Sequence, residues 1–207
     1  MIDPLGGPAY WWPLAAAAVV AYLIGAVPFG PILVKLAGAG DLRRIGSGNT
    51  GATNVLRTGR KGLALAVLVL DALKGGLPTG LAYAWFGPDM AKVVALAAVV
   101  GHCWPVYLGF KGGKGVATAA GVVFALVPLA GAAALAVFAL VVGLSRYVSL
   151  GSLTACAAAP LAAWVLGWPQ YAPVLAAIAL VVVVKHAGNI RRLLAGDENK
   201  LGAAKGG

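Results

Sequence analysis

Long apolar stretches separated by short polar segments run through most of the chain, and this pattern predicts membrane-spanning helices in an all-α fold. One helix needs about 20 apolar residues to cross the hydrocarbon core of a bilayer. The apolar run from Val116 to Ser145 is too long for one upright helix, and Pro128 divides it near its middle. We therefore expect a polytopic membrane protein with about seven helices, at residues 11–36, 63–85, 91–108, 116–127, 129–144, 150–166 and 172–184. A re-entrant hairpin at 116–145 would instead leave five full spans and the same orientation.

The positions of the Lys and Arg residues predict how the chain is oriented. If the N-terminus lies outside, 14 of the 16 basic residues fall in segments on the cytoplasmic side, as the positive-inside rule requires. The outer turns, at residues 86–90 and 167–171, then have only Lys92 nearby. The C-terminus and the three longest polar segments would lie in the cytoplasm.

Composition supports an integral membrane protein that forms a single domain over residues 1–207. The chain is 61% hydrophobic and only 11% charged, whereas a soluble domain averages about 25% charged residues. The formal net charge is +10. Topology and anionic lipid account for that charge, because the cations flank apolar spans, and we expect no nucleic-acid partner. Cys103 and Cys156 show no metal-ligand spacing, so we expect free thiols.

The first polar segment, residues 46–57, has the side chains and glycines that suit a phosphate-binding loop. Its glycines permit tight turns that expose backbone N–H groups. If a helix starts within it, Thr53 and Arg57 form an i,i+4 pair that can face one ligand. A capped helix start is the simpler alternative, but it would not need the additional Thr, Asn and Arg residues. The candidate residues are Ser47, Gly48, Asn49, Thr53, Asn54 and Arg57.

The second polar segment contains two lysines and three glycines just before an apolar helix. Glycine N–H groups and a helix start form a nest for an anion, to which the lysines add charge. The segment is not a Walker A loop, because Thr118 lies too far from Lys114. A positively charged membrane anchor is the alternative. The candidate residues are Lys111, Gly112, Gly113 and Lys114, with His102 as a weaker candidate, since a lone His near a helix end is more often structural.

The third polar segment places His186 and Asn189 at i,i+3 on one helix face, followed by Arg192. Histidine is the side chain that most often handles protons in catalysis. A helix end whose cations complement the dipole would explain the arginine, but not the His with the Asn. A weaker polar insertion between two spans adds Ser149 and Ser152 as candidates.

The acidic residues indicate chemistry without a metal. Asp71 and Lys74 lie within the second expected span at i,i+3, and a structural ion pair is the favoured interpretation. The other acids form no cluster that would bind Mg²⁺ or Zn²⁺. We therefore expect neither metal nor other cofactor. A CDP-alcohol phosphotransferase is disfavoured, because it would need several convergent Asp residues.

Three motifs occur in a fixed order along the chain. They are Gly-Ser-Gly-Asn-Thr-Gly-Ala-Thr-Asn-x-x-Arg, Gly-His-x-x-Pro-x5-Lys-Gly-Gly-Lys-Gly-Val-Ala-Thr and His-x-x-Asn-Ile-x-Arg-Leu, with Gly-x-Glu-x-Lys downstream. Together they resemble the PlsY family, the bacterial acyl-phosphate-dependent glycerol-3-phosphate acyltransferases. The resemblance covers residues 22–200. It implies a seven-helix protein of the bacterial inner membrane with a site facing the cytoplasm. It also implies transfer of a fatty acyl group from acyl-phosphate to glycerol 3-phosphate, which yields lysophosphatidic acid and phosphate.

The resemblance also implies roles for individual residues. Phosphate would be held by Ser47, Gly48, Thr53 and Arg57. Glycerol 3-phosphate would be bound by Lys111, Gly112, Gly113 and Lys114. His186 and Asn189 would orient substrate and stabilise charge at the acyl carbonyl, with Ser149 or Ser152 assisting. The remaining candidates for substrate binding are Asn49, Asn54, His102 and Arg192.

Acyl-phosphate is already activated, so we expect direct attack by the glycerol hydroxyl and no covalent acyl-enzyme. The base is either His186 or an oxygen of the substrate phosphate, whose second pKa is about 6. We expect a monomer surrounded by membrane lipids. The competing class is a transporter or channel for an anionic or phosphorylated solute, whose charges should line a path through the bilayer. The clustering of the polar motifs on one side disfavours that class.

Overall fold

The computed structural model describes residues 8–202, with side chains from residue 11 onward, and all regular structure in that range is helical. The chain divides into two compact units, one ending at Leu126 and the other beginning at Val127. The all-α fold expected from the sequence is confirmed.

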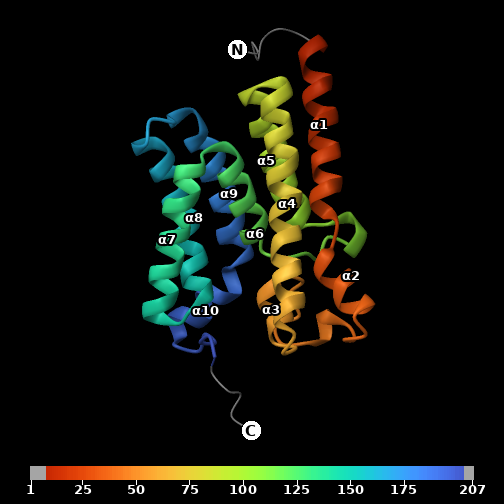
Figure 1. Cartoon of the computed structure of the whole chain (residues 1–207), viewed down its shortest axis with the longest axis vertical. Coiled ribbons are helices and arrows are strands. Elements are labelled where there is room, and N and C mark those ends of the chain that lie inside the picture. The colour runs from red at the N-terminus through yellow and green to blue at the C-terminus, as the bar shows by residue number, and fades with distance from the viewer. Residues whose placement is uncertain (1–7, 203–207) are drawn as a thin grey trace. The chain divides into compact units, whose positions relative to one another are not determined.

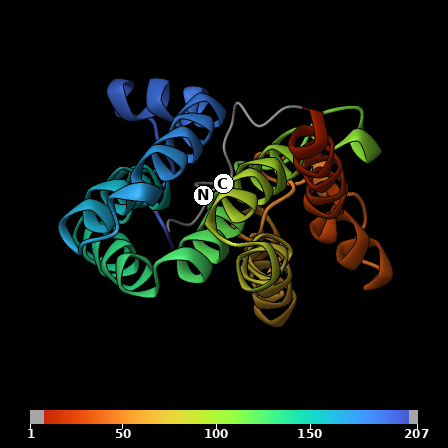
Figure 2. The same cartoon turned by 90° about the horizontal axis from the view of Figure 1, so that it is seen from above.

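The first unit is a bundle that carries the first two polar segments. Its helices are α1 (Pro8–Ala26), α2 (Phe29–Leu36), α3 (Ala52–Leu56), α4 (Lys61–Phe86), α5 (Pro88–Cys103) and α6 (Val116–Leu126). Helix α5 packs against α1 and α4, and α4 also packs against α6 (Figure 1). Helices α2 and α3 lie at the end of the unit away from the beginning of α1. Figure 2 shows α1 and α4 nearly end-on.

The first expected span consists of two helices instead of one. Pro28 has no N–H group and disfavours a helical conformation in the residue before it. Helix α1 therefore ends at Ala26, and α2 begins at Phe29. The two helices together still form a candidate span of 26 residues, Trp11–Leu36. The break also makes the Val27 carbonyl available to a side chain from α4.

Glycines let the helices of this unit approach one another closely. A Cβ atom on Gly121 of α6 would overlap the carbonyl of Ala72 in α4. A Cβ atom on Gly101 of α5 would overlap the carbonyl of Tyr22 in α1. Close backbone packing of this kind is a main source of helix association in a bilayer, because lipid tails are as apolar as the side chains.

An apolar cluster joins α2, α3 and α4 beneath the first polar segment. Its buried members are Val34, Leu42, Val55, Ala64 and Val67. Val34, Val55 and Val67 come from three different helices, and all three are fully buried. The cluster therefore fixes the chain on both sides of the first polar segment.

The second unit contains α7 (Pro128–Ser145), α8 (Val148–Val165), α9 (Ala172–Lys185) and α10 (Ala187–Ala195). Helix α8 packs against α7 and α9 (Figure 1). The division expected at Pro128 is present, and α7 begins at the proline itself, because proline at the first helical position loses no intrahelical bond. Helix α10 is bent by 63° from α9. His186 lies at this bend.

The length and surface of the helices suit a membrane. Within residues 8–202, five segments are long and apolar enough to cross a bilayer, and six if α9 and α10 count as one. Helix α6 is apolar but has only 11 residues. Large apolar side chains such as Val19, Leu68 and Leu161 are exposed, which is typical of a surface that contacts lipid. The count of seven spans and the orientation stay predictions.

Candidate active site

Asn54 holds the first polar segment in shape. Its side chain is only 1% exposed. The amide nitrogen donates to the carbonyls of Leu42 at 3.1 Å and Ile45 at 2.8 Å. The amide oxygen accepts from the backbone N–H of Ser47 at 3.1 Å. Both ends of the side chain are thus used by the loop itself, and a contact between Asn54 and substrate stays a prediction.

The loop held by Asn54 also requires a glycine at position 46. Its φ of +55° lies in the left-handed region, which favours glycine. A Cβ atom there would also collide with Asn54 Oδ1 and with the side chain of Arg57. Arg57 follows α3 directly and covers Gly46. The conformation of the loop and the position of the arginine are therefore linked.

The other candidates of this segment surround the same turn. Ser47, Thr53 and Arg57 are exposed, so each can reach a ligand. Gly48 has a φ of +68°. Asn49 accepts a hydrogen bond from the backbone N–H of Gly51 at 2.9 Å, which forms the turn that leads into α3. The segment thus presents hydroxyl groups and a guanidinium at a tight glycine turn.

The second polar segment rests on His102, at the end of α5. The backbone N–H of Gly113 donates to the carbonyl of His102 at 3.1 Å. A Cβ atom on Gly113 would overlap the imidazole ring of His102, and one on Gly112 would overlap its carbonyl and Pro105. Both glycines are therefore needed for the loop to lie on this histidine. His102 is 6% exposed and supports the loop from beneath.

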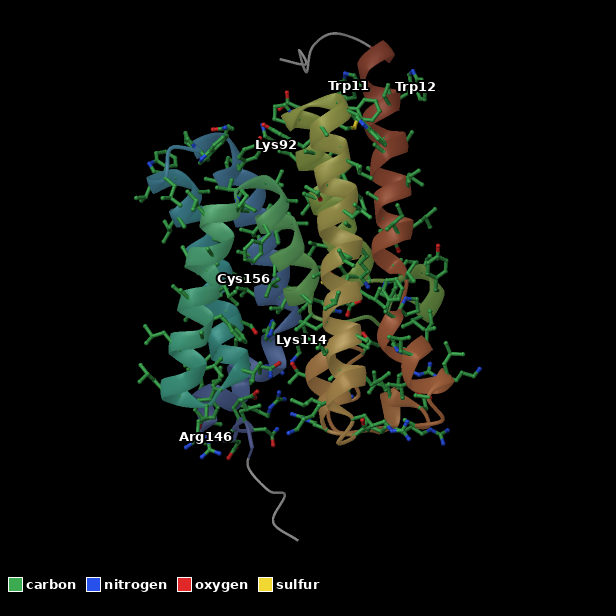
Figure 3. The ribbon with its side chains drawn as sticks, viewed as in Figure 1. Trp11, Trp12, Lys92, Lys114, Arg146 and Cys156 are labelled. Carbon is green, nitrogen blue, oxygen red and sulfur yellow. The ribbon has the colours of Figure 1, made fainter. Side chains whose placement is uncertain are left out.

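The lysines of this loop differ in their surroundings. Lys111 is exposed, and Lys114 is half-buried. Figure 3 shows Lys114 part-way along the first unit, whereas Trp11, Trp12 and Lys92 lie at one end of it. Helix α6 begins at Val116, so the partial positive charge of its N-terminus adjoins the glycines. Cations and backbone N–H groups at a helix start form an anion-binding arrangement.

The ion pair expected within the second span is present. Lys74 Nζ lies 2.7 Å from Asp71 Oδ1, and both side chains are almost completely buried. These two residues line a small hollow together with Thr50, His102 and Pro105. The hollow is partly open to solvent and small, with room for about one water molecule. Thr50 of the first polar segment and His102 beside the second thus line the same hollow as the buried charge pair.

In the second unit, His186 lies at the bend between α9 and α10 and is 2% exposed. Its Nδ1 lies 2.8 Å from the carbonyl oxygen of Val182. A carbonyl only accepts, so Nδ1 carries the hydrogen. In the neutral ring, Nε2 is then the acceptor. This tautomer is the one that suits a group that takes a proton from, or orients, a hydroxyl.

Glu198 organises the third polar segment, although the sequence pattern predicted no role for it. Its Oε1 accepts from Asn189 Nδ2 at 2.6 Å and from the Ser149 hydroxyl at 2.9 Å. Its Oε2 accepts from Arg192 Nε at 2.8 Å. Partial burial alone would raise the pKa of Glu198, but hydrogen bonds from these three side chains and the Arg192 charge lower it overall. Three candidate site residues thus converge on one carboxylate.

A signal for Glu198 was available. It is one of only six acidic residues in the chain, and Arg191, Arg192 and Lys200 lie within seven positions of it. The downstream motif Gly-x-Glu-x-Lys contains it. Its partner Ser149 is 49 positions away, however, and only the fold brings the two together.

The segment that contains Glu198 is hydrogen-bonded to the turn between α7 and α8. Arg146 donates from Nη2 to the Leu201 carbonyl at 2.8 Å, and Leu201 N–H donates back to the Arg146 carbonyl at 2.7 Å. Lys200 Nζ lies 5.6 Å from the centre of the Tyr147 ring, in a cation–π contact. Figure 3 shows Arg146 at the end of α7. Ser152, by contrast, donates to the carbonyl of Val148 in its own helix, at 2.8 Å.

The described residues offer cations and hydrogen-bond donors more than carboxylates. Within residues 8–202, no group of three or more His, Cys, Asp or Glu side chains could hold a metal ion. The independence from metal and cofactor stays a prediction. The available groups suit binding of phosphate and stabilisation of developing negative charge.

Comparison with known proteins identifies the family. The family model for glycerol-3-phosphate acyltransferase matches residues 15–196. A glycerol-3-phosphate acyltransferase of Methylorubrum extorquens (strain PA1) is 54% identical over 192 residues, which cover 92% of this chain and 95% of the relative. The enzyme of the same name from Jannaschia sp. (strain CCS1) is 50% identical, over 91% of this chain and 93% of the relative.

Two solved structures have the same fold. One is PlsY (YgiH), described as an integral membrane glycerol 3-phosphate acyltransferase, in its glycerol 3-phosphate form. It is 42% identical, with a TM-score of 0.87, and the match covers 92% of this chain and 96% of that one. The other is its lysophosphatidic acid form, at 40% identity and a TM-score of 0.86, with the same coverage. The resemblance to the PlsY family is thus confirmed, and the chain belongs to the glycerol-3-phosphate acyltransferase family.

Proposed function

We propose that the protein transfers a fatty acyl group from acyl-phosphate to glycerol 3-phosphate, giving lysophosphatidic acid and phosphate. The observation that carries this proposal is the likeness to PlsY in its glycerol 3-phosphate form, at 42% identity over 92% of the chain. The two polar loops of the first unit support it, because they offer cations and backbone N–H groups to a phosphorylated substrate. A transporter or channel is not favoured by these relatives.

With acyl-phosphate as the donor, the reaction is a single displacement at the acyl carbon. The oxygen of the glycerol hydroxyl forms a bond to the acyl carbon, and the bond from that carbon to the phosphate oxygen breaks. The hydroxyl proton goes to a base, and phosphate leaves with the electron pair of the broken bond. Because phosphate is a good leaving group, no covalent acyl-enzyme and no metal is required.

The candidate residues have two kinds of role: some bind phosphate, and others act in the chemical step. Ser47, Gly48, Thr53 and Arg57 bind phosphate, with Asn49 and Asn54 shaping their loop. Lys111 and Lys114 bind glycerol 3-phosphate on the glycines of the second segment, and His102 supports that loop. These assignments are supported by the exposure of Ser47 and Arg57 and by the contacts of His102.

In the second unit, His186 and Asn189 act on the acyl carbonyl and the attacking hydroxyl. Arg192 and Ser149 hold Glu198, which in turn holds Asn189. Ser152 assists as a neighbour of Ser149 on α8. The base is either His186, through Nε2, or an oxygen of the substrate phosphate. In the second case His186 only orients the reacting groups.

We further propose a monomer that acts in the bacterial inner membrane, with its site facing the cytoplasm. The distribution of the basic residues supports this orientation. The family match runs from residue 15 to residue 196, across the boundary between the two compact units. This continuity supports a single acyltransferase domain.

The decisive experiment is an assay of the purified protein with acyl-phosphate and glycerol 3-phosphate in the presence of EDTA. Formation of lysophosphatidic acid and inorganic phosphate in equal amounts is expected. Replacing acyl-phosphate with acyl-CoA tests the choice of donor. Activity with acyl-CoA alone, or loss of activity on chelation with recovery in Mg²⁺, would contradict the proposal.

A further inference from the structure

Asp71 is an acidic side chain buried inside the helices of the first unit, and the proposed chemistry does not use it. It is 2% exposed. Its Oδ1 lies 2.7 Å from Lys74 Nζ and 3.6 Å from His102 Nδ1. One carboxylate oxygen therefore faces two different basic side chains, one on its own helix and one on α5.

From His102 the contact continues to the second polar segment. The imidazole ring lies directly against Gly113, with no room for a Cβ atom between them. The carbonyl of His102 accepts the hydrogen bond from the N–H of Gly113. The ring therefore limits where Gly113 can lie, and the His102 carbonyl and Pro105 limit the position of Gly112.

From Lys74 the contact continues to the first polar segment. Lys74 Nζ donates to the Val27 carbonyl at 2.8 Å, at the break between α1 and α2. It also lies 5.6 Å from the centre of the Phe29 ring. The next residue, Gly30, is packed so closely against the carbonyl of Thr50 that a Cβ atom would overlap it. Thr50 lies inside the Asn49–Gly51 turn that leads into α3.

We propose that Asp71 is a positioning residue that holds both polar loops of the first unit in their binding conformations. It acts through His102 on residues 109–115 and through Lys74, Val27 and Gly30 on the turn at Thr50. Only the expected change in the KM for glycerol 3-phosphate rests on the proposed acyltransferase function; the positioning of the loops does not.

The energetics of buried charges support a positioning role over a role in stability. A buried ion pair is often no more stabilising than well-packed apolar residues of similar size. Ionisable groups inside membrane-spanning helices are costly and are typically retained for function. Here the pair is joined to two glycine loops that carry the phosphate-binding groups, and an apolar pair would leave both loop supports without an orienting partner.

The test compares three variants of the full-length protein in detergent. Asp71→Asn removes the charge and keeps the size. Asp71→Asn combined with Lys74→Met also removes the ammonium that would otherwise be buried without a counter-charge. Asp89→Asn is the matched control, because Asp89 and Lys92 form an Asp–Lys pair of the same i,i+3 spacing, at 2.9 Å, on the surface of α5.

Two readouts distinguish positioning from stability. Hydrogen–deuterium exchange should rise about fivefold or more in peptides covering residues 46–51 and 109–115 in Asp71→Asn, the equivalent of roughly one lost hydrogen bond. The KM for glycerol 3-phosphate should rise by a similar factor or more, whereas Asp89→Asn should change neither. In the double variant the thermal midpoint should recover towards wild type, but fast exchange at 109–115 should remain, because His102 still lacks Asp71.

Wild-type exchange in both loops of a folded Asp71→Asn or double variant would overturn the inference. If the single variant does not fold, the double variant decides the question on the same readouts. A wild-type protein without acyltransferase activity would contradict the proposed function alone, since hydrogen exchange does not depend on turnover.

Discussion

Lys114 is the residue whose side chain most directly tests the binding of glycerol 3-phosphate. It is half-buried in the second polar loop, next to the start of α6. A charge-assisted hydrogen bond to phosphate contributes about 1.5–3 kcal/mol, so Lys114→Ala should raise the KM for glycerol 3-phosphate about 10- to 150-fold. The KM for acyl-phosphate should change less. Lys61→Ala, an exposed cation at the start of α4, serves as the control, and equal effects of both variants would contradict the assignment.

Asn54 offers a test of how the first loop keeps its shape. Asn54→Ala would leave the Leu42 and Ile45 carbonyls and the Ser47 N–H without their side-chain partner. The Leu42 and Ile45 carbonyls each keep a backbone donor. The loss is therefore that of three hydrogen bonds at about 0.5–1.5 kcal/mol each, or roughly 2–4 kcal/mol in stability. Thermal unfolding measures this loss. Asn49→Ala removes one hydrogen bond and should cost less, and a smaller effect at Asn54 than at Asn49 would count against the role of Asn54.

The lowered pKa of Glu198 predicts that the stability of the protein decreases at acidic pH. Its pKa in the folded protein lies below the reference value of 4.5, so the folded state binds this proton less readily than the unfolded state. Its contribution to stability is therefore fully present above about pH 4.5, and it is lost as the pH falls through the lower folded pKa. Glu198→Gln should be less stable than wild type at pH 7, and the difference should shrink below pH 4.5.

Thermal unfolding of both proteins between pH 7 and pH 3.5 measures that difference. Asp197→Asn changes the exposed neighbour and is the control. A difference between wild type and Glu198→Gln that stays constant over the whole range would show that the three hydrogen bonds do not depend on the charge.

The residue scale also shows which parts of the site could be predicted. The motif around Ser47 and the Lys111–Lys114 loop could be singled out from local composition alone, and their binding of phosphate stays a prediction. The contact of Asp71 with His102 was missed, because the two residues lie on different helices and no periodic pattern links them. Glu198 was missed for the same reason, since its partner Ser149 is far away in the sequence.

At the scale of helices, the close contact between α4 and α6 depends on glycine at positions where a side chain would collide with the other helix. Gly121→Ala should destabilise the first unit by about 1–3 kcal/mol, because the new Cβ atom would overlap the carbonyl of Ala72. Gly80→Ala in the same helix pair is the matched control, since its Cβ atom would meet only the Ala125 Cβ, at 4.0 Å.

Alanine is favoured over glycine in a helix by up to about 1 kcal/mol, so Gly80→Ala should be neutral or stabilising. Thermal unfolding in detergent compares the two variants. Equal midpoints would mean that the helices can separate without cost and that close approach at Gly121 is not a source of stability.

Apolar length predicted most helices, and prolines explain several of their boundaries. Pro128 was recognised as the division between two helices, the second expected from Leu129, and α7 begins at the proline itself. Pro28 was not recognised as a break, because the apolar pattern continues on both sides of it. The bend at His186 has no proline to mark it, and the 63° angle depends on packing that the sequence pattern does not contain.

At the scale of the whole molecule, the family match indicates the activity and the distribution of basic residues predicts the orientation. The family match extends over residues 15–196, which include all three polar motifs. The division after Leu126 could not be predicted, because it depends on which helices pack together and not on composition along the chain.

The orientation in the membrane is the prediction that belongs to this scale. With the N-terminus outside, 14 of 16 basic residues face the cytoplasm, where the two water-soluble substrate head groups would be found. Single cysteines can report the side of the membrane in a background with Cys103→Ala and Cys156→Ala. Gln170→Cys tests the outer turn before α9, and Arg44→Cys and Arg191→Cys test the inner side. All three positions are exposed.

A thiol reagent that does not cross membranes should label Gln170→Cys in intact cells. It should label Arg44→Cys and Arg191→Cys only after the membrane is permeabilised, because both positions lie in segments whose cations resist translocation. Labelling of Arg44→Cys and Arg191→Cys in intact cells, with Gln170→Cys protected, would mean that the molecule is inverted. Labelling of only one of the two inner positions in intact cells would instead show that an odd number of spans separates Arg44 from Arg191. The seven-helix topology would then have to be revised.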